Sequence, residues 1–262
     1  MVTKSNGAIL WSGASLLDGA PIVVIAIGLA VRNLRKVNRK TGAMIQTYIL
    51  RADMSPMDAI HGSADASICG SCVHRGDAGN GSGRTCYVNI GQGPTVVYKM
   101  FAAGKYPVCT DTLDLADIGR DRMVRLGTYG DPAAVPAYVW QSLLADAAGH
   151  TGYTHQWRVI DAATWSPLVM ASADTAQDAR DAWARGYRTF RVSMAAAKVD
   201  VREVLCPASK EAGAKVTCAQ CKACSGTSSA RKGSVYIPLH GGTAVMANAP
   251  KLAVRLIARV AV

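Results

Sequence analysis

The chain has 262 residues, of which 50% are apolar and 18% are charged. This length and apolar fraction are enough for one sizeable hydrophobic core, which excludes a disordered tail protein and a disulfide-stapled miniprotein. Lys and Arg number 29 against 18 Asp and Glu, so the net charge is +11. The longest apolar run, residues 21–31, is too short to span a bilayer. The sequence therefore predicts a soluble cytoplasmic protein without a membrane partner.

The apolar pattern predicts strands that alternate with helices along most of the chain. We expect strands at 44–51, 123–128, 152–157, 168–173, 187–194 and 235–239, and a buried strand or short core helix at 21–31. Helices are expected at 95–105, 135–148 and 175–185. The last of these helices has Asp174 as its expected N-cap and Gly186 as its stop. Such alternation is typical of βαβ units that form a mainly parallel sheet.

About five or six strands fit this pattern, fewer than the eight of a closed (β/α) barrel. The expected fold class is therefore α/β, as a partial or open (β/α) barrel, with a doubly wound sheet as the alternative. In both folds ligands bind at the carboxyl ends of the strands. We expect a single α/β domain over 1–262, with an N-terminal strand and basic segment at 1–43, a βα core at 44–200 and a Cys-rich basic region at 201–262.

Eight cysteines are the first indication of function. They fall into two groups, 69–86 and 206–224, with Cys109 standing alone. Because the cytosol disfavours disulfides, grouped cysteines in such a protein indicate metal ligation or redox chemistry. Cys109 is expected to be a small buried apolar residue instead.

The second cysteine group is the most specific signal in the chain. Cys206 directly precedes Pro207, and Cys218, Cys221 and Cys224 follow at intervals of three. A Cys-x2-Cys-x2-Cys run with a remote Cys-Pro is the layout of ferredoxin-like clusters, in which thiolates bind iron. Four thiolates also suit a structural zinc site, although zinc ligands usually come as two separated Cys-x2-Cys pairs.

The first group consists of Cys69, Cys72 and Cys86, with a glycine-rich stretch at 76–83 between the last two. Three thiolates can hold an iron–sulfur cluster and leave one iron open. Alternatively they take a fourth ligand from Cys109, from His74 or from the second group, or both groups meet around one cluster.

A strand at 123–128 is followed by Gly130, Asp131 and Pro132, which lead into a helix. Such a turn presents backbone groups and one carboxylate at the edge of a sheet where ligands bind, so Gly130 and Asp131 are candidate cofactor-binding residues. The alternative is that Asp131 only caps the helix that Pro132 starts. His155 ends a predicted strand at the same edge, where it can act as an acid, a base or a hydrogen-bond donor.

Positive charge is concentrated at two places. Residues 185–262 carry 13 Lys and Arg against 3 acidic residues, and a second basic run lies at 32–40. A field of this size attracts polyanions, because neutralised phosphates release condensed counterions. The candidate residues for nucleic-acid contact are Arg32, Arg35, Lys36, Arg39, Lys40, Arg231 and Lys232.

The order of these motifs resembles a family of bacteriophage gene products with Cys-rich ends and a radical-SAM-like (β/α) middle, over roughly residues 35–226. The segments that carry the resemblance are 38–42 (Asn-Arg-Lys-Thr-Gly), 67–72 (Ser-Ile-Cys-Gly-Ser-Cys), 86–87 (Cys-Tyr), 125–131 (Arg-Leu-Gly-Thr-Tyr-Gly-Asp), 153–154 (Tyr-Thr), 206–207 (Cys-Pro) and 218–224. The resemblance implies a [4Fe-4S] protein of phage origin in the host cytoplasm. The turn Gly130-Asp131-Pro132 is similar to the Gly-Glu-Pro turn that binds S-adenosylmethionine in radical-SAM enzymes, with Asp in place of Glu.

The sequence thus favours a phage-type [4Fe-4S] protein that binds nucleic acid through a basic surface. The predicted metal ligands are Cys69, Cys72, Cys86, Cys206, Cys218, Cys221 and Cys224. One alternative is a radical-SAM-like or other redox enzyme that uses an open cluster iron, because an open iron can bind a substrate or S-adenosylmethionine. Another is a structural protein stapled by zinc.

Overall fold

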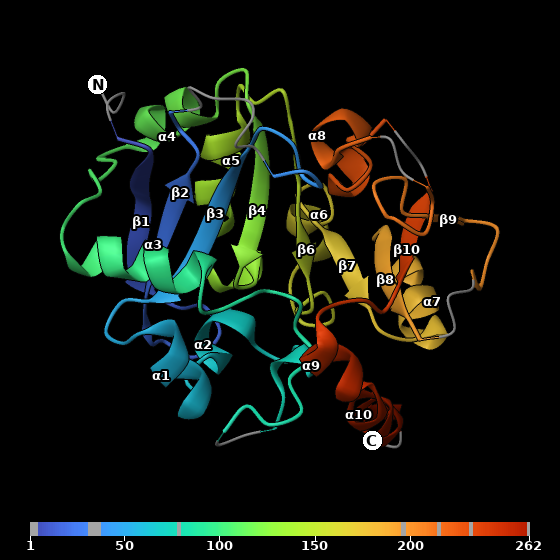
Figure 1. Ribbon diagram of the computed structural model, residues 1–262. Coiled ribbons are helices and arrows are strands. Elements are labelled where there is room, and N and C mark those ends of the chain that lie inside the picture. The colour runs from blue at the N-terminus through green and yellow to red at the C-terminus, as the bar shows by residue number, and fades with distance from the viewer. Residues whose placement is uncertain are drawn as a thin grey trace.

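The computed structural model describes residues 5–30, 38–77, 80–194, 198–213, 216–230 and 233–260. Within these residues the chain forms two five-stranded sheets, which lie side by side in Figure 1. The expected α/β class is confirmed. The strand order of the first sheet is β1 (Gly7–Ala14), β2 (Pro21–Ile27), β3 (Met44–Arg51), β4 (Met123–Tyr129) and β5 (Gly149–Thr151). The strand order of the second sheet is β6 (Tyr153–Thr154), β7 (Met170–Ala173), β8 (Thr189–Ser193), β10 (Ser234–Pro238) and β9 (Glu203–Leu205).

The pairing of the strands is mostly parallel. From β3 to β5 and throughout the second sheet, every neighbouring pair is parallel, whereas β1, β2 and β3 are paired antiparallel. The antiparallel part departs from the βαβ pattern because β1 and β2 are joined by a short turn, which only antiparallel neighbours allow. Gly19, with φ of +80°, forms part of that turn.

The two sheets meet at Gly152, the one residue between β5 and β6. A side chain there would approach the Leu168 carbonyl oxygen and Val169 Cγ1 to 3.0 Å, so only glycine fits without displacing them. Its backbone N–H donates to the Cys224 carbonyl at 3.0 Å, and its carbonyl accepts from Met170 N. One bent strand segment therefore belongs to both sheets and also contacts the second cysteine group.

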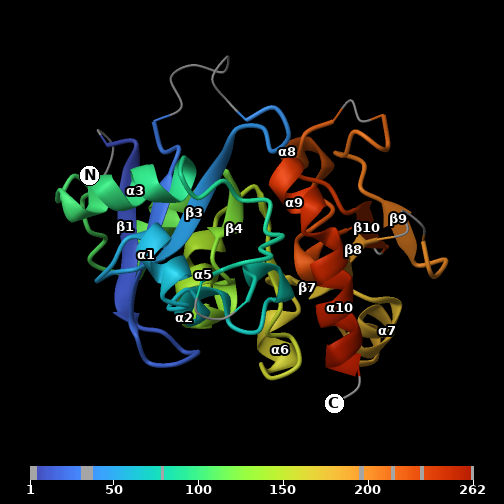
Figure 2. The same cartoon turned by 60° about the horizontal axis from the view of Figure 1, so that its bottom comes forward.

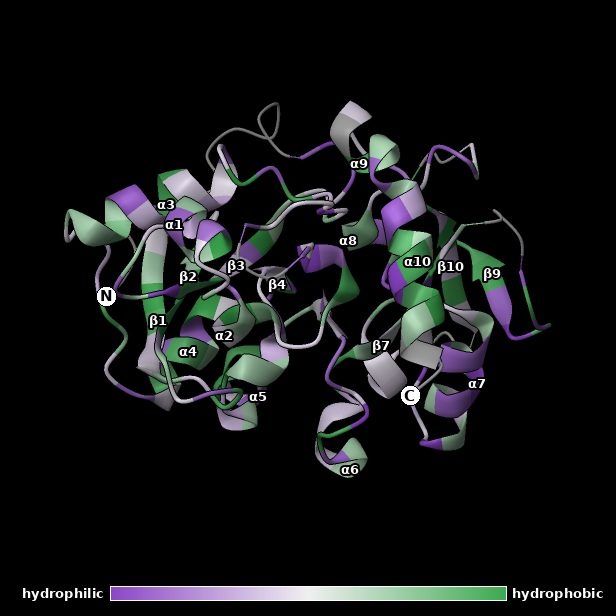
Figure 3. Ribbon diagram, turned by 90° about the horizontal axis from the view of Figure 1, so that it is seen from below, coloured by the Kyte–Doolittle hydropathy of each residue, from purple (hydrophilic) through white to green (hydrophobic). Residues whose placement is uncertain are grey.

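The helices cover both faces of the sheets. Their bounds are α1 Pro56–His61, α2 Ala66–Cys69, α3 Gly93–Ala102, α4 Thr112–Gly119, α5 Ala137–Leu144, α6 Ala162–Trp165, α7 Ala176–Ala184, α8 Cys218–Cys221, α9 Thr243–Ala247 and α10 Ala249–Val260, with short 3-10 turns at Val73–Arg75, Pro132–Ala134 and Gly226–Ser228. Seen from below, α3 lies on one side of the first sheet and α4 and α5 lie on the other (Figure 3), whereas α1, α2, α9 and α10 lie below the lower ends of the strands in Figure 1.

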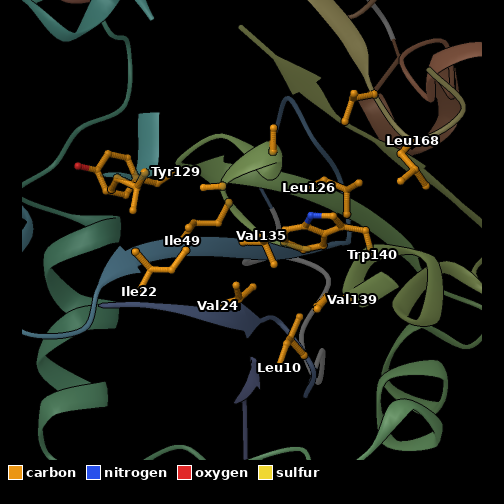
Figure 4. Packing of buried hydrophobic residues seen from close by; sticks show 14 of the residues in the cluster. Leu10, Ile22, Val24, Ile49, Leu126, Tyr129, Val135, Val139, Trp140 and Leu168 are labelled. Atoms are coloured by element: carbon orange, nitrogen blue, oxygen red, sulfur yellow. The ribbon is translucent and has the colours of Figure 1, made fainter. Parts of the chain in front are cut away.

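The larger hydrophobic core lies on the first sheet and reaches the start of the second. It contains side chains of β2, β3 and β4 together with Ala171 of β7 and with Leu168 and Val169, which precede β7. Trp140 of α5 is fully buried in this core beside Leu126, Val135 and Val139 (Figure 4). Each large apolar side chain buried in this way contributes about 1.5–3 kcal/mol to stability.

Most predicted elements are confirmed, with local corrections. The strand predicted at 44–51 is β3, and the run at 21–31 begins with a strand, β2. Asp174 as the N-cap of the helix at 175–185 is wrong: Thr175 caps α7, because its hydroxyl accepts from Asp178 N in a capping box. The helix predicted at 135–148 is shorter, and of the strand at 152–157 only Tyr153–Thr154 pairs. The reason is the change of sheet at Gly152, which apolar spacing does not reveal.

None of the helices in the described part of the chain combines the length and the hydrophobicity needed to cross a lipid bilayer.

Candidate metal centre

Seven of the eight cysteines line one cavity of about 200 Å³. They come from four separate stretches of the chain and are Cys69, Cys72, Cys86, Cys206, Cys218, Cys221 and Cys224. Tyr87, whose side chain is 60% exposed, also lines the cavity, which therefore reaches the protein surface. All of these cysteines are free thiols. The lone Cys109 does not line the cavity.

The first cysteine group is positioned by the side chain of Gln156 and by the glycine-rich stretch 76–83. Cys69 ends α2, and Gly70 follows with φ of +53°. The Gln156 amide packs directly against Gly70, where a side chain would come within 2.6 Å of it. Gln156 also donates to the Cys69 carbonyl at 3.3 Å and accepts from the Ser71 hydroxyl at 3.3 Å. The loop between Cys69 and Cys72 is thus held by one side chain from the segment after β6.

The glycine-rich stretch returns the chain to this group, as its composition predicts. Thr85 N and Cys86 N both donate to the His74 carbonyl, at 3.1 and 3.0 Å. Gly76, with φ of +96°, lies so close to Gly81 that a side chain would meet its carbonyl oxygen at 2.6 Å. Cys86 is thereby brought near Cys69 and Cys72, so that Cys72 and Cys86 help to raise the pKa of Cys69, and Cys72 helps to raise that of Cys86.

The second cysteine group is assembled from two segments. Thr217 caps α8 through a capping box with Gln220, so that Cys218 and Cys221 stand on one short helical turn. This turn is bound to the end of the N-terminal segment, because Cys218 N donates to the Lys40 carbonyl at 2.9 Å. Cys206 follows β9, where its N–H donates to the Tyr236 carbonyl of β10 at 2.9 Å.

Cys224 completes the second group at the junction of the two sheets. Its carbonyl accepts from Gly152 N, and Gly226 follows with φ of +58°. Arg188 donates to the Gly226 carbonyl at 2.7 Å. Cys206, Cys221 and Cys224 are all at most 9% exposed. Cys224 lies close enough to Cys206, Cys218 and Cys221 for each of them to help raise its pKa.

The surroundings of the second group are apolar. The thiols pack with Met170, Val235 and Ile237 in a separate hydrophobic cluster. Burial raises the pKa of Cys224 to about 12, even though a hydrogen bond from Tyr153 opposes the shift. Burial also raises the pKa values of Cys206 and Cys218. A thiolate needs a compensating positive charge in such a place, and a metal supplies one.

The surroundings of the first group are polar. Cys72 Sγ lies 3.9 Å from His155 Nε2. Burial opposes ionisation of Cys72, but the neighbouring His155 outweighs it and lowers the pKa of the thiol. His155 Nε2 in turn lies 3.4 Å from Asp174 Oδ1. Burial raises the pKa of Cys69, and the Cys72 thiolate adds to the shift.

Two cations from different segments also line the cavity. Arg125 of β4 is 8% exposed, donates to the Tyr87 hydroxyl at 2.6 Å and interacts electrostatically with Cys218. Within the described residues its Nε has no hydrogen-bond partner. Lys40 Nζ lies 3.3 Å from His240 Nε2. These cations give the cavity a preference for anionic contents.

Gly130 and Asp131 line the cavity, but both carboxylate oxygens of Asp131 accept hydrogen bonds within the protein. Asp131 Oδ1 accepts from Ala133 N at 3.0 Å, so the capping role considered for this residue is confirmed. Its Oδ2 accepts from His155 N at 2.8 Å and from the Gln156 amide at 3.3 Å. Asp131 is thus a positioning residue that connects the turn after β4 to His155 and Gln156.

The predicted nucleic-acid residues fall in two classes. Arg39 and Lys40 are exposed. Arg32, Arg35, Lys36, Arg231 and Lys232 lie outside the described residues. Many other basic side chains of the last third bind protein oxygens: Arg185 binds the Arg158 carbonyl, Arg188 the Gly226 carbonyl, Arg191 the Glu203 carboxylate, Lys222 the Ala148 carbonyl, Lys251 the Ser82 hydroxyl and Arg255 the Asp77 carboxylate. Much of the basic excess there therefore serves internal contacts.

Sequence reasoning missed Asp174, Arg125 and Gln156 as members of this site. Asp174 directly follows β7 and His155 directly follows β6, so both stand at carboxyl ends of adjacent parallel strands. That position was the available signal, because ligands gather at this edge in α/β folds. Nothing in the spacing of Arg125 or Gln156 marks them. Comparisons of the chain with protein-family models, with curated sequences and with solved structures find no match.

Proposed function

We propose that this chain is an iron–sulfur protein in which Cys206, Cys218, Cys221 and Cys224 hold a [4Fe-4S] cluster. The observation that carries the proposal is the convergence of free thiols from distant segments on one cavity. Cys69, Cys72 and Cys86 line the same cavity and form a second set of iron ligands in this proposal. When bound, the cluster would supply one-electron redox chemistry.

The thiol sulfurs are not spaced as the ligands of a single zinc ion. With Zn–S bonds of about 2.3 Å, tetrahedral zinc keeps its sulfurs about 3.8 Å apart. Among the described residues, which include every cysteine, no three thiol sulfurs all lie within 4.8 Å of one another. Sulfurs bound to different irons of one cluster stand farther apart, and Arg125 and Lys40 provide positive charge beside the second group.

Iron and acid-labile sulfide per chain test the proposal. Protein reconstituted without oxygen is expected to be brown, with about four irons and four sulfides for each cluster. Cys221→Ser is expected to remove the cluster of the second group, whereas Cys109→Ser, the matched control outside the cavity, leaves the content unchanged. Colourless protein would overturn the proposal, and so would the same iron and sulfide content in Cys221→Ser and Cys109→Ser. Bound zinc that Cys221→Ser removes would establish the zinc-stapled alternative.

An enzyme that uses an open cluster iron is the second candidate, and the first cysteine group favours it. Three cysteines leave one iron of a cubane without a thiolate, and these three line the cavity together with Gly130 and Asp131. The parallel strands β3, β4 and β5 of the first sheet and β6, β7, β8 and β10 of the second support an open α/β arrangement. In this candidate function the arrangement would correspond to a radical-SAM-like (β/α) barrel. An electron paramagnetic resonance spectrum of the reduced cluster that S-adenosylmethionine leaves unchanged would exclude the radical-SAM version.

Nucleic acid is the partner that the charge supports. The net charge is +11. Arg39 and Lys40 are both exposed, and Lys40 also lines the cavity. Binding to DNA or RNA is expected to weaken steeply with salt, and each lost phosphate contact lowers the slope of log K against log salt by about 1. Arg39→Gln with Lys40→Gln should show this reduction. Binding that does not depend on salt, or no binding at all, would overturn nucleic acid as the proposed partner.

A further inference from the structure

Two imidazoles and one carboxylate converge at the carboxyl ends of the parallel strands β6 and β7. His155 directly follows β6 and Asp174 directly follows β7, while His74 comes from the 3-10 turn Val73–Arg75. His74 Nε2 lies 3.2 Å from Asp174 Oδ1, and His155 Nε2 lies 3.4 Å from the same oxygen. All three ligand atoms lie within 4.8 Å of one another, and the group borders the cavity.

The surrounding residues fix the orientation of these groups. His74 Nδ1 lies 2.9 Å from the Thr85 hydroxyl oxygen, and both residues are buried. With the proton on Nδ1 donated to Thr85, the lone pair of His74 Nε2 is directed toward Asp174, as in metal-bound histidines. The Asp131 carboxylate holds the backbone of His155, and the Asp174 side chain is 2% exposed.

The convergence on one oxygen suits a metal ion as well as a pair of hydrogen bonds, since one carboxylate oxygen can accept from both imidazoles. Without a metal, both imidazoles must carry protons on Nε2 to bind the single Asp174 Oδ1. A cation replaces both protons and accepts all three ligand atoms at once. We propose that His74, His155 and Asp174 bind one divalent transition-metal ion, Fe²⁺ or Zn²⁺. Two histidines and a carboxylate are the protein ligands of non-haem iron and of catalytic zinc, and both leave coordination positions open. Here those positions adjoin the cavity.

This ion differs from the proposed clusters in composition, although its ligand His155 lies 3.9 Å from the Cys72 sulfur of the first group. Iron and sulfide are present in equal numbers in a [4Fe-4S] cluster, whereas a mononuclear ion adds metal without sulfide. We therefore expect iron plus zinc to exceed acid-labile sulfide by one per chain. Absence of sulfide with one metal retained would overturn the clusters alone, and equality of metal and sulfide would overturn the mononuclear site alone.

Variants assign the excess metal to these residues. His155→Gln and Asp174→Asn are expected to remove the excess metal, while the exposed His61→Gln, the matched control, keeps it. Thr85→Val keeps all three ligands and removes only the partner of His74 Nδ1, so it should weaken metal affinity about 10-fold to 100-fold with sulfide unchanged. Zinc or iron in the excess fraction identifies the ion. Excess metal that persists in folded Asp174→Asn, with unaltered affinity in Thr85→Val, would overturn the inference.

Discussion

The two cysteine groups line one cavity with the same kind of thiol but have opposite surroundings. The second group packs with Met170, Val235 and Ile237, and burial raises the pKa of Cys224 to about 12. In the first group burial likewise opposes ionisation of Cys72, yet the contact with His155 lowers the pKa of that thiol. Figures 1 and 2 show the two regions on separate parts of the fold: in Figure 1, α1 and α2 lie near the lower ends of the strands of the first sheet, and α8 lies near the top of the picture.

In the proposed function, the two groups would therefore be prepared for metal in different ways. The first group is positioned by protein groups, since Gln156 and Asp131 hold its loop and its histidine without any metal. The second group places thiols in an apolar cluster, where a thiolate is stable only with a nearby positive charge. We therefore expect the second region to depend on metal for its folding and the first to depend on it much less.

Metal removal is the largest expected effect. A strong chelator under reducing conditions should reduce hydrogen-exchange protection in β9, β10 and α8, because binding energy of about 10–16 kcal/mol for a structural site is folding energy. Protection in β2 and β3 should remain, since those strands lie in the fully buried core of the first sheet. Equal protection of β10 with and without chelator would contradict the comparison.

The second-largest expected effect is a loss of stability on substitution of Gly226, which follows the second cysteine group. A side chain at Gly226 would approach the Ser166 carbonyl oxygen to 2.2 Å, and its φ is +58°. Gly226→Ala is therefore expected to lower the free energy of unfolding by about 3 kcal/mol or more. Chemical denaturation measures this loss, together with iron content.

Gly213→Ala is the matched control for this substitution. Gly213 has φ of +63° but nothing within 4 Å of an added Cβ, so only backbone strain of about 1 kcal/mol is expected. Equal losses in the two variants would show that close packing at Gly226 contributes nothing.

Much of the fold could be predicted from local sequence. The apolar run of β3 and the Thr-to-Gly interval around α7 are strong local signals, and both produce the expected elements. The strand β1 and the helix α10 were missed. For α10 the sequence contained a signal, the four-residue spacing of Leu252 and Leu256, and the structure buries both of these leucines. For β1, small and polar residues interrupt the apolar alternation in Gly7–Ala14.

The candidate site was predictable only as a set of donor residues. Cysteine spacing predicts which thiols bind metal, but the approach of Cys72 to His155 joins residues 83 positions apart, and no spacing rule covers it. Asp174 shows the limit most clearly. Its position before a helix favours an N-cap, yet the neighbouring Thr175 takes that role, and the Asp174 carboxylate contacts His74 and His155.

Asp131→Asn tests whether the first cysteine group is assembled separately from the second. The new amide nitrogen would face the donors of His155 and Gln156, so we expect a loss of about 2 kcal/mol in the free energy of unfolding. Iron bound by the first group should fall, and iron bound by the second should not. The control Asp161→Asn changes the exposed cap of α6, where Asn caps about as well, so stability should change by about 0.5 kcal/mol or less. A loss of iron from both groups would contradict their separate assembly.

The smallest expected effect concerns the charge beside the second group. Arg125 interacts with Cys218, and reduction of a cluster adds negative charge next to this guanidinium. Removing the positive charge destabilises the reduced state more than the oxidised one, so Arg125→Gln should make the midpoint potential more negative. A shift on the order of 50 mV is expected, close to the 59 mV of a tenfold change for one electron. Arg122→Gln is the control, because Arg122 binds the Gly28 carbonyl and is not among the residues lining the cavity. Redox titration measures both variants, and an unchanged or more positive potential in Arg125→Gln would show that this cation does not act on the second cysteine group.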